Sequence, residues 1–308
     1  MSELKNQNQR FKNFQDTGVI EKVDPQVFSD MVDREQRANL VMDDVTAVED
    51  TRLVGAPGSS IDIPRTGTVE HVDKTEGEAT DPQTARRGTV NVSVSTKQTI
   101  VRLTDEAEED SLLNEPEEIA MEIGEAIAER HDEDAYSMIT DADHELDVDE
   151  FDGDTLGDRV REYELEEEGV VDYKSAKDLA FEMRQERDRA DSLVLSFEHA
   201  GQLLDEDKFI LVNESGTSQG LREGMIGRFA GLEVYVTEMA DGISVEAGDI
   251  QGVVLDSERA FVKATKRQPT FELDREGEAG YDSIIATSRY GYEVLNPEAI
   301  GWLVNPAE

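Results

Sequence analysis

A hairpin-like stretch from Gly55 to Leu103 constrains the fold of this chain more than any other feature. Apolar residues recur on both limbs, and between Val90 and Val94 they alternate strictly with polar ones, which is the period of a half-buried strand. The apolar positions are Ile61, Ile63, Val69, Val72, Val90, Val92, Val94, Ile100 and Leu103. A two-stranded hairpin is marginally stable in water without a third strand or a helix to cover it. We therefore expect its apolar face to be covered by another part of the same chain or by a second copy.

The tip of this hairpin, from Asp73 to Gly88, is polar and contains the adjacent arginines Arg86 and Arg87. Two interpretations of the arginines stay open. They could belong to a solvated turn, or they could form an ion pair with an acidic neighbour, which is readily available in a chain as acidic as this one.

The chain is strongly acidic, with 72 Asp and Glu residues against 30 Lys and Arg residues and a formal net charge of -42. Such a charge on a folded chain repels itself at low salt. At molar salt the Debye length falls to about 3 Å and the repulsion is screened. We interpret the charge as salt adaptation. Intrinsic disorder is the alternative, but apolar periodicity along most of the chain opposes it. The charge also disfavours a sequence-specific nucleic-acid binder, which needs a basic face.

The length of 308 residues allows one large or two ordinary domains, and a hydrophobic content of 37% is sufficient for a globular core. The sequence contains no Cys, so neither a disulfide framework nor thiolate chemistry is expected. No run of about 18 apolar residues occurs, and no charged-then-apolar leader follows Met1, so we expect no membrane span and no signal peptide.

The N-terminal half reads as an extended arm followed by two helices. Residues 1–24 are polar, and the first fifteen carry a net charge of +2. A helix is expected to start at Asp24 as N-cap and Pro25 as first helical residue, and to run to about residue 49. A second helical stretch covers 104–140, with Pro116 opening its longer piece.

The C-terminal half reads as alternating helices and strands. The acidic stretch 141–168 is expected to be an exposed loop leading into a helix. Further helices are predicted over 173–189, 200–204 and a last short segment that begins at Asn296 and Pro297 and carries Trp302. Strands are predicted over 192–197, 209–212, 232–236, 251–255, 270–274 and 281–294. Because residues 29–135 contain no aromatic residue, we expect the compact core in the C-terminal half.

Signatures of enzyme chemistry are missing from the sequence. It has no phosphate-binding loop, no zinc-protease motif and no nucleophile elbow. Gly224, Gly227 and Gly231 have the spacing of turn glycines and not of a dinucleotide fingerprint. The four histidines, His71, His131, His144 and His199, are scattered, and each is interpreted as a surface or helix residue. We therefore expect no cofactor and no catalytic residue.

One acidic loop is a weak candidate for a metal site, because hard cations prefer clustered carboxylates. Its residues are Asp147, Asp149, Asp152 and Asp154, next to Gly153. Phe151 occupies the position that would carry the third ligand of an EF-hand loop. A solvated acidic loop is therefore the preferred interpretation.

The order of these parts resembles the major capsid protein of tailed double-stranded DNA viruses, which has the Hong Kong 97 fold. The most specific segments are 224–236, 252–263 and 282–300, which resemble the recurring strands, turns and closing helix of that family. The acidity adds a resemblance to tailed viruses of salt-loving archaea.

The resemblance implies an α+β fold in five parts. These are an N-terminal arm over 1–54, an extended loop over 55–103, a spine helix with the acidic loop over 104–158, an axial domain over 159–250, and returning strands of the peripheral domain with a closing helix over 251–308. The 54 residues before the loop leave little room for a built-in scaffolding segment. Lys74 and Lys97 lie in the loop, but no cross-link motif can be matched to them.

The function implied by the resemblance is a structural protein that self-assembles as hexamers and pentamers into an icosahedral virion capsid. Its partners would be other copies, portal, scaffolding and decoration proteins, and packaged DNA bound non-specifically, with no membrane and with assembly in the host cytoplasm. The contact between subunits would use Ile61, Ile63, Val69, Arg86, Arg87, Val90, Val92 and Val94. Two alternatives stay open: a halophilic soluble enzyme with an acidic metal site, and the shell of an encapsulin-type compartment.

Overall fold

The structure is a computed structural model that carries side chains, and it divides into two compact units. Unit 1 comprises residues 1–40, 95–131 and 267–290, and unit 2 comprises 41–94, 132–266 and 291–308. The residues that the structure describes are 30–32, 34, 36, 40–46, 48–66, 87–104, 115–141, 160–185, 189–204, 210–211, 225–238, 240, 248–277 and 280–306.

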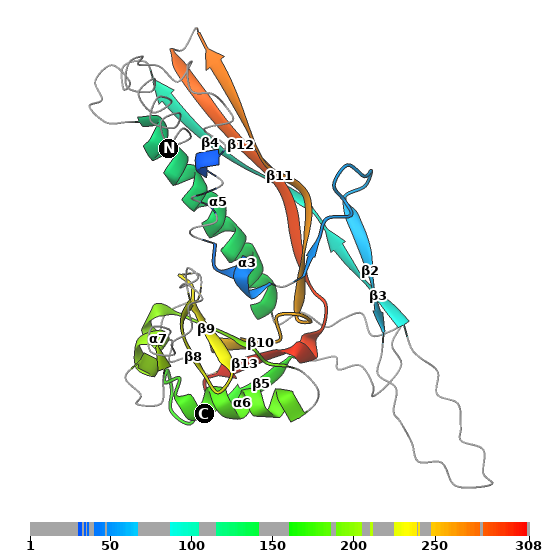
Figure 1. The fold of residues 1–308 in the computed structure, drawn as a ribbon, viewed down its shortest axis with the longest axis vertical. Helices are drawn as coiled ribbons and strands as arrows, with labels where there is room; N and C mark the ends of the chain where they lie inside the picture. Colours follow the sequence, from blue (N-terminus) through cyan, green and yellow to red (C-terminus); the bar gives the residue numbers. More distant parts are fainter. Residues whose placement is uncertain are drawn as a thin grey trace, which may run out of the picture. The chain divides into compact units, whose positions relative to one another are not determined.

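Unit 2 is built on a seven-stranded mixed sheet with the strand order β5-β13-β10-β6-β9-β8-β7 (Figure 1). Its strands are β5 (Arg161–Glu164), β6 (Ser192–Leu195), β7 (Ile210–Leu211), β8 (Met225–Phe229), β9 (Leu232–Val236), β10 (Ile250–Leu255) and β13 (Ile300–Val304). All four residues of β6 and all five of β13 are buried. Short, continuous apolar runs of this kind are typical of strands that are covered on both faces.

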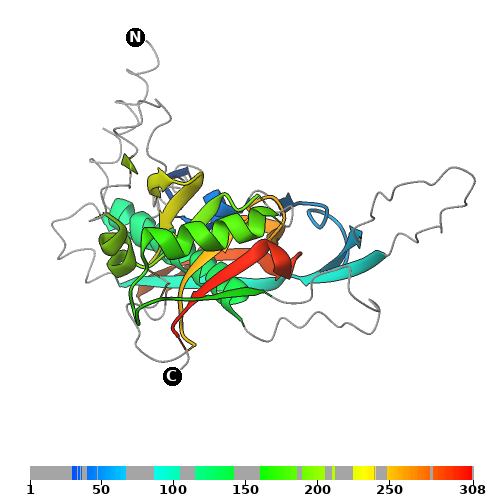
Figure 2. The same ribbon diagram turned by 90° about the horizontal axis from the view of Figure 1, so that it is seen from below.

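Helix α6 (Tyr173–Gln185) packs on this sheet, as both views show (Figures 1 and 2). Asp172 caps its start, because the Oδ1 atom of Asp172 accepts the backbone N–H of Ser175 at 2.9 Å. Residues at helical spacing, among them Ala176, Leu179 and Met183, form the buried face. They share a core cluster of residues 165–303 with Leu203 of helix α7 (Phe197–Leu204). The compact core predicted for the C-terminal half is therefore confirmed.

Unit 1 holds the first part of helix α5 (Glu115–Thr140) beside strands β4 (Ser95–Thr104) and β12 (Tyr281–Val294). The side chains of Ile119, Ile123 and Ile127 recur every four residues and pack against Ile284 and Ala286 of β12. The strands β4 and β12 pair antiparallel, from Tyr281 opposite Thr104 to Tyr290 opposite Ser95. Together with β1 (Glu49–Asp50) and β11 (Phe261–Glu276) they form a four-stranded sheet in the order β1-β11-β12-β4.

The expected helices and strands are confirmed at α5, α6, β6, β7, β9, β10 and β12, and in part at α7 and β11. Pro116 is the second residue of α5. An N–H group in the first turn has no acceptor within the helix, so the missing N–H of proline costs no helical hydrogen bond there. No helix among the described residues is long and apolar enough to cross a membrane.

Two predicted helices differ from the structure in extent or in element type. The helix predicted to run to residue 49 is broken at Leu40 and Val41, continues only as α3 (Met42–Val45) and is followed by β1. The expected start of that helix at Asp24 lies outside the described residues. The helix expected at the end of the acidic stretch is strand β5, which pairs parallel with β13.

The last short helix was also wrong, because only Pro297–Ala299 forms a 3₁₀ turn and Trp302 lies on β13. Its indole Nε1–H donates to the carbonyl oxygen of Ile139 at 2.9 Å. A short apolar run bounded by a proline does not separate strand from helix by periodicity, which explains the error.

Candidate functional site

The hairpin predicted between Gly55 and Leu103 is present as strands β2 (Ser60–Thr66) and β3 (Arg87–Ser93). They form a separate two-stranded antiparallel sheet in which Ile61 lies opposite Val92 and Ile63 opposite Val90. The returning limb does not continue as one hairpin strand. After Val94 the chain enters β4, which pairs with β12 in another sheet. The hairpin is therefore shorter than the expected stretch from Gly55 to Leu103.

The apolar face of the hairpin is covered by its own chain. Val92 is fully buried, and Val90 and Val94 are 7% and 6% exposed. Val92 and Val94 share a core cluster with Leu53 and with residues of β11, and Ile61 and Ile63 are partly buried against it. The sequence left open whether the same chain or a second copy covers this apolar face. The same chain covers it. Contact with a neighbouring subunit is therefore not needed to cover the three valines.

The opposite face of the hairpin is polar and exposed. Asp62 and Asn91, which lie opposite each other, are joined by a hydrogen bond of 2.6 Å from the Asn91 amide to the Asp62 carboxylate. Thr89 and Ser93 are exposed on the same strand as Asn91. This face offers hydrogen-bonding groups and one carboxylate instead of an apolar surface.

Several residues singled out in the sequence, as candidate sites or as histidines and glycines of interest, lie outside the described residues. These are Val69, Arg86, His71, His144, Asp147, Asp149, Asp152, Asp154 and Gly224. Arg87 is the first residue of β3. Among the residues that the structure does describe, no group of three or more His, Cys, Asp or Glu side chains is arranged to hold a metal ion.

The base of the hairpin is held by two close contacts within unit 2. Gly291 of β12 approaches the end of β3 so closely that a Cβ atom at residue 291 would lie 2.0 Å from the carbonyl oxygen of Ser93. The ammonium group of Lys266 donates to the carbonyl oxygens of Ala56, at 3.1 Å, and of Gly58. These contacts fix the turn before β2 and the junction after β3.

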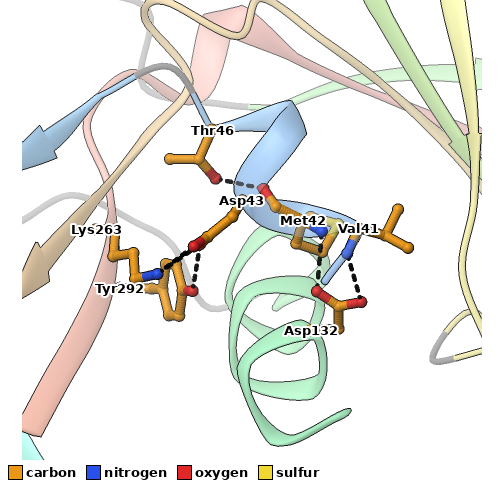
Figure 3. Close-up of polar contacts among 7 residues, drawn as sticks. All are labelled: Val41, Met42, Asp43, Thr46, Asp132, Lys263 and Tyr292. Atoms are coloured by element: carbon orange, nitrogen blue, oxygen red, sulfur yellow. Dashed lines mark hydrogen bonds and ion pairs between the residues drawn. The ribbon is translucent and has the colours of Figure 1, made fainter. Parts of the chain in front are cut away.

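Within unit 2, a partly buried ion pair ties α3 to β11 and β12 (Figure 3). The ammonium group of Lys263 lies 2.7 Å and 2.5 Å from the two carboxylate oxygens of Asp43, and the hydroxyl of Tyr292 donates to the same carboxylate at 3.2 Å. Lys263 is only 8% exposed. Because the ammonium has a carboxylate partner, its burial is tolerated.

A buried carboxylate, Asp132 of α5, caps the start of α3 (Figure 3). Its oxygens accept the backbone N–H groups of Val41 at 3.1 Å and Met42 at 2.9 Å. These are donors that a helix start leaves without a partner in the helix itself. Burial raises the pKa of Asp132 to about 6, although the two N–H donors oppose this by favouring the ionised form.

Asp43, Asp132 and Lys263 are not predicted as functional residues by any motif in the sequence. A signal for Asp132 was available, because this charged residue continues the apolar stripe of α5 between Ala128 and Ala135, which are both buried. A charge on the core side of a helix indicates a specific buried partner. Nothing in the sequence pairs Asp43 with Lys263, which lie 220 residues apart.

Two histidines and two glycines can be placed. His131 and His199 lie on α5 and α7 as expected, but both are buried, and the ring of His131 stacks on Tyr290 with centroids 3.6 Å apart. Gly231 lies in the turn between β8 and β9 with φ +84°, which confirms its turn role. Gly227 was wrongly expected in a turn, because it lies in β8 at an irregularity of the pairing.

His199 forms a hydrogen bond of 2.8 Å between its Nδ1 atom and the hydroxyl of Ser196, a residue pair that can serve nucleophilic catalysis in other settings. Here both side chains are buried, at 0% and 3% exposure. The Ser196 hydroxyl also accepts the backbone N–H of His199 at 3.3 Å, as in an N-cap. Burial lowers the pKa of His199. The pair is therefore structural: it begins helix α7.

The chain matches one protein family and is similar in fold to several solved structures. Residues 85–304 match the family described as Phage capsid protein. No curated protein matches the sequence significantly. Among solved structures, the capsid of the cyanophage P-SCSP1u matches with a TM-score of 0.63 and 14% identity over 88% of this chain and 90% of that chain.

Two further structures are similar in fold. The capsid of an empty GTA particle matches with a TM-score of 0.61 and 14% identity, over 88% of this chain and 91% of its own. A chain of Mycobacterium phage Che8 matches with a TM-score of 0.54 and 19% identity, over 82% of this chain and 89% of its own. Identities this low establish the fold alone.

Proposed function

The chain belongs to the phage capsid protein family, and we propose that its copies assemble as hexamers and pentamers into an icosahedral shell around packaged double-stranded DNA. The observation that carries this proposal is the fold likeness to the cyanophage capsid over nearly nine-tenths of both chains. A major capsid protein has a structural role, so the proposed function needs no catalytic residue and no cofactor. The shell would form in the host cytoplasm and remain in the virion.

We assign parts of the structure to the roles that such a shell requires. The seven-stranded sheet with α6 and α7 would be the axial domain, and it includes β10 and β13, which the sequence-based division had placed in the segment 251–308. The long strands β11 and β12 with β4 would belong to the peripheral domain, α5 would be the spine helix, and β2 with β3 would be the root of the extended loop. Residues 1–54 would form the arm.

The contact between subunits would use what the chain itself leaves exposed on the extended loop. Because the three buried valines are covered by their own chain, we assign this contact to the polar face around Asp62 and Asn91 and to the loop between β2 and β3. Arg86 immediately precedes β3 in the sequence, and Arg87 is the first residue of that strand. In this proposal they pair with carboxylates of a neighbouring copy.

The acidity supports a host that lives in concentrated salt, and we propose a tailed virus of salt-loving archaea. At a formal charge of -42 per copy, a shell of many copies would require strong screening to assemble. The first fifteen residues, with a net charge of +2, are the segment best suited to contact DNA non-specifically. Portal, scaffolding and decoration proteins would complete the particle.

The test is assembly of the purified chain in molar salt, alone and together with the products of neighbouring genes, followed by light scattering and electron microscopy. A matched variant replaces residues 74–86 with a short Gly-Ser linker and keeps β2 and β3. We expect shells from the natural chain and folded but assembly-defective protein from the variant. A natural chain that stays monomeric in every condition contradicts the proposed shell, and normal shells from the variant contradict the role of the loop.

A further inference from the structure

Strand β4 lies at one end of the four-stranded sheet, next to β12 (Figure 1). The two strands pair over ten residues, from Ser95 to Thr104 on β4, without a register shift. Among the described residues, the central segment Gln98–Arg102 has no strand beside it other than β12. A long and regular edge strand presents a row of backbone N–H and C=O groups with which a further strand can pair.

The middle of this edge lacks the devices that usually prevent such pairing. Natural edge strands are protected by short length, by proline, by bulges or by charged side chains, lysine above all. The segment Gln98–Arg102 has no proline and no bulge, and its one charged residue is Arg102. The Arg102 guanidinium lies 5.1 Å from the centroid of the Tyr281 ring, so it packs on a residue of its own sheet. The middle of β4 is therefore well suited to pair with another strand.

The stretch that contains β4 is also free of acidic residues. No Asp or Glu occurs from residue 82 to residue 104, between Asp81 and Asp105, whereas 72 of the 308 residues of the chain are acidic. Two copies of so acidic a chain repel each other wherever carboxylates face carboxylates. Copies can therefore meet along β4 without this repulsion.

An exposed isoleucine lies at the middle of the strand. Ile100 is 50% exposed and lies directly opposite Ile285 of β12, which is half-buried. Val101 and Leu103, on the opposite face of β4, are partly buried against the isoleucines of α5. An apolar stripe thus crosses the exposed face of the sheet and ends at its edge.

We propose that β4 pairs antiparallel with β4 of a second copy, about a two-fold axis that passes beside Ile100. The two sheets then form one continuous sheet, and the stripes of Ile100 and Ile285 from both copies join. The contact is isologous, because each copy contributes the same strand. The inference deepens the proposed function and rests on it for the place of the pair, since an icosahedral shell has two-fold axes at which neighbouring copies meet.

The sequence of β4 favours this register over the neighbouring one. With Ile100 opposite its symmetry mate, Gln98 lies opposite Arg102, and Lys97 lies opposite Leu103, so no like charges face each other. A shift by one residue would place Lys97 opposite Arg102. The same shift would turn the second Ile100 to the other face of the sheet, so the two apolar stripes would not join.

A cysteine at residue 100 tests the pairing directly, because the natural chain contains no cysteine. Residues directly opposite each other in an antiparallel pair have Cα atoms about 4.5 to 5.5 Å apart, a distance that a disulfide can span. Ile100→Cys would be oxidised under mild conditions in molar salt, and we expect disulfide-linked dimers as the main product. A chain that stays monomeric overturns the proposal, and this is also the result if another segment of the same chain occupies the edge.

Two further substitutions test the register. Thr96 and Thr104 are exposed on the same face of β4 as Ile100, each four residues from the axis. In the proposed register each lies about 27 Å from its own mate, so Thr96→Cys and Thr104→Cys should each remain monomeric alone. An equal mixture of the two should couple residue 96 of one copy to residue 104 of the other, as mass spectrometry of the digested dimer would show. Self-coupling of either variant, or no coupling in the mixture, overturns the proposed two-fold pair.

A charge at the axis gives an independent readout. Ile100→Lys places two ammonium groups opposite each other, and Met121→Lys, which changes an exposed side chain of α5, is the matched control. We expect Ile100→Lys to keep its thermal unfolding temperature but to need about tenfold more protein to associate in molar salt, as measured by analytical ultracentrifugation, with the control unchanged. Equal association of the two variants overturns the proposal.

Failure of the proposed function is distinguishable from failure of this inference. Particles in which Ile100→Cys does not couple contradict the β4 pair and leave the shell intact as a proposal. Disulfide-linked dimers of Ile100→Cys, from a chain that never forms particles, contradict the shell and support the β4 pair.

Discussion

The ion pair of Lys263 with Asp43 makes the sharpest prediction at the scale of single residues. Lys263→Met keeps the length of the side chain but leaves Asp43, whose side chain is 33% exposed, without its cation. Breaking a fully buried pair costs about 3 to 5 kcal/mol, and partial exposure reduces this to about 2 kcal/mol of unfolding free energy. Denaturant unfolding measures the difference.

A matched control and a double variant test the cause of that loss. Lys177→Met removes a lysine whose ammonium lies 2.9 Å from Asp178 on the surface of α6, and stability should barely change. Adding Asp43→Asn to Lys263→Met should recover part of the loss, because the uncompensated charge disappears. No recovery would mean that packing of the Lys263 side chain, and not its charge, explains the effect.

Asp132 predicts a pH dependence with a defined sign. Its pKa is about 6 in the folded chain against 3.8 for the unperturbed group, so the neutral form is favoured by folding. The stability contributed in this way is fully present below about pH 4 and is lost as the pH rises through about 6. Asp132→Asn cannot titrate, and its amide accepts only one of the two N–H groups of α3.

The natural chain should therefore lose stability relative to Asp132→Asn as the pH rises from about 4 to about 6. Denaturant unfolding of both proteins at fixed salt across this range measures the difference in their unfolding free energies. The other titrating groups are the same in both proteins, so they do not contribute to this difference. A difference that stays constant with pH would contradict the assignment of a raised pKa to this carboxylate.

At the scale of elements, Gly291 is the residue on which the junction between the hairpin and β12 depends. A Cβ atom there would lie 2.0 Å from the backbone oxygen of Ser93, so Gly291→Ala forces the strands apart. We expect a loss of about 3 kcal/mol. Gly201→Ala on α7 is the control, because its Cβ meets nothing within 4 Å, and it should gain about 1 kcal/mol from helix propensity. Equal effects of the two substitutions would refute the close approach.

The sequence predicted those elements whose own periodicity is strong. The isoleucine repeat of α5 and the long alternation of β12 mark these elements without outside help. Elements defined by distant partners were missed: β5 exists because it pairs with β13, which follows it by well over a hundred residues. The covering surface of the hairpin also depends on distant residues of β11, so the sequence left two possibilities open.

The candidate site was less predictable than the fold for the same reason. The sequence predicts that three valines of the hairpin need to be covered, and the structure confirms that Val90, Val92 and Val94 are buried. Tertiary contacts, which the sequence does not show, decide which chain covers them. Asp43 and Lys263 look like two ordinary surface charges in the sequence. Only the fold places them within a hydrogen bond of each other.

At the scale of the whole molecule, the net charge predicts that folding depends on salt. With a formal charge of -42, raising NaCl from about 0.1 M to about 3 M should raise the midpoint of urea unfolding, because screening weakens the repulsion of the folded state. Sucrose, which stabilises by exclusion without screening charge, is the control. A midpoint that does not respond to NaCl, or responds equally to sucrose, would contradict salt adaptation.

The central claim is that this chain builds a capsid shell, and electron cryo-microscopy of the purified chain in molar salt tests it most directly. We expect closed icosahedral shells in which each asymmetric unit holds copies of the two-unit fold, with the loop between β2 and β3 of one copy touching another. Protein that remains monomeric or forms only small oligomers, alone and with its neighbouring gene products, would contradict it.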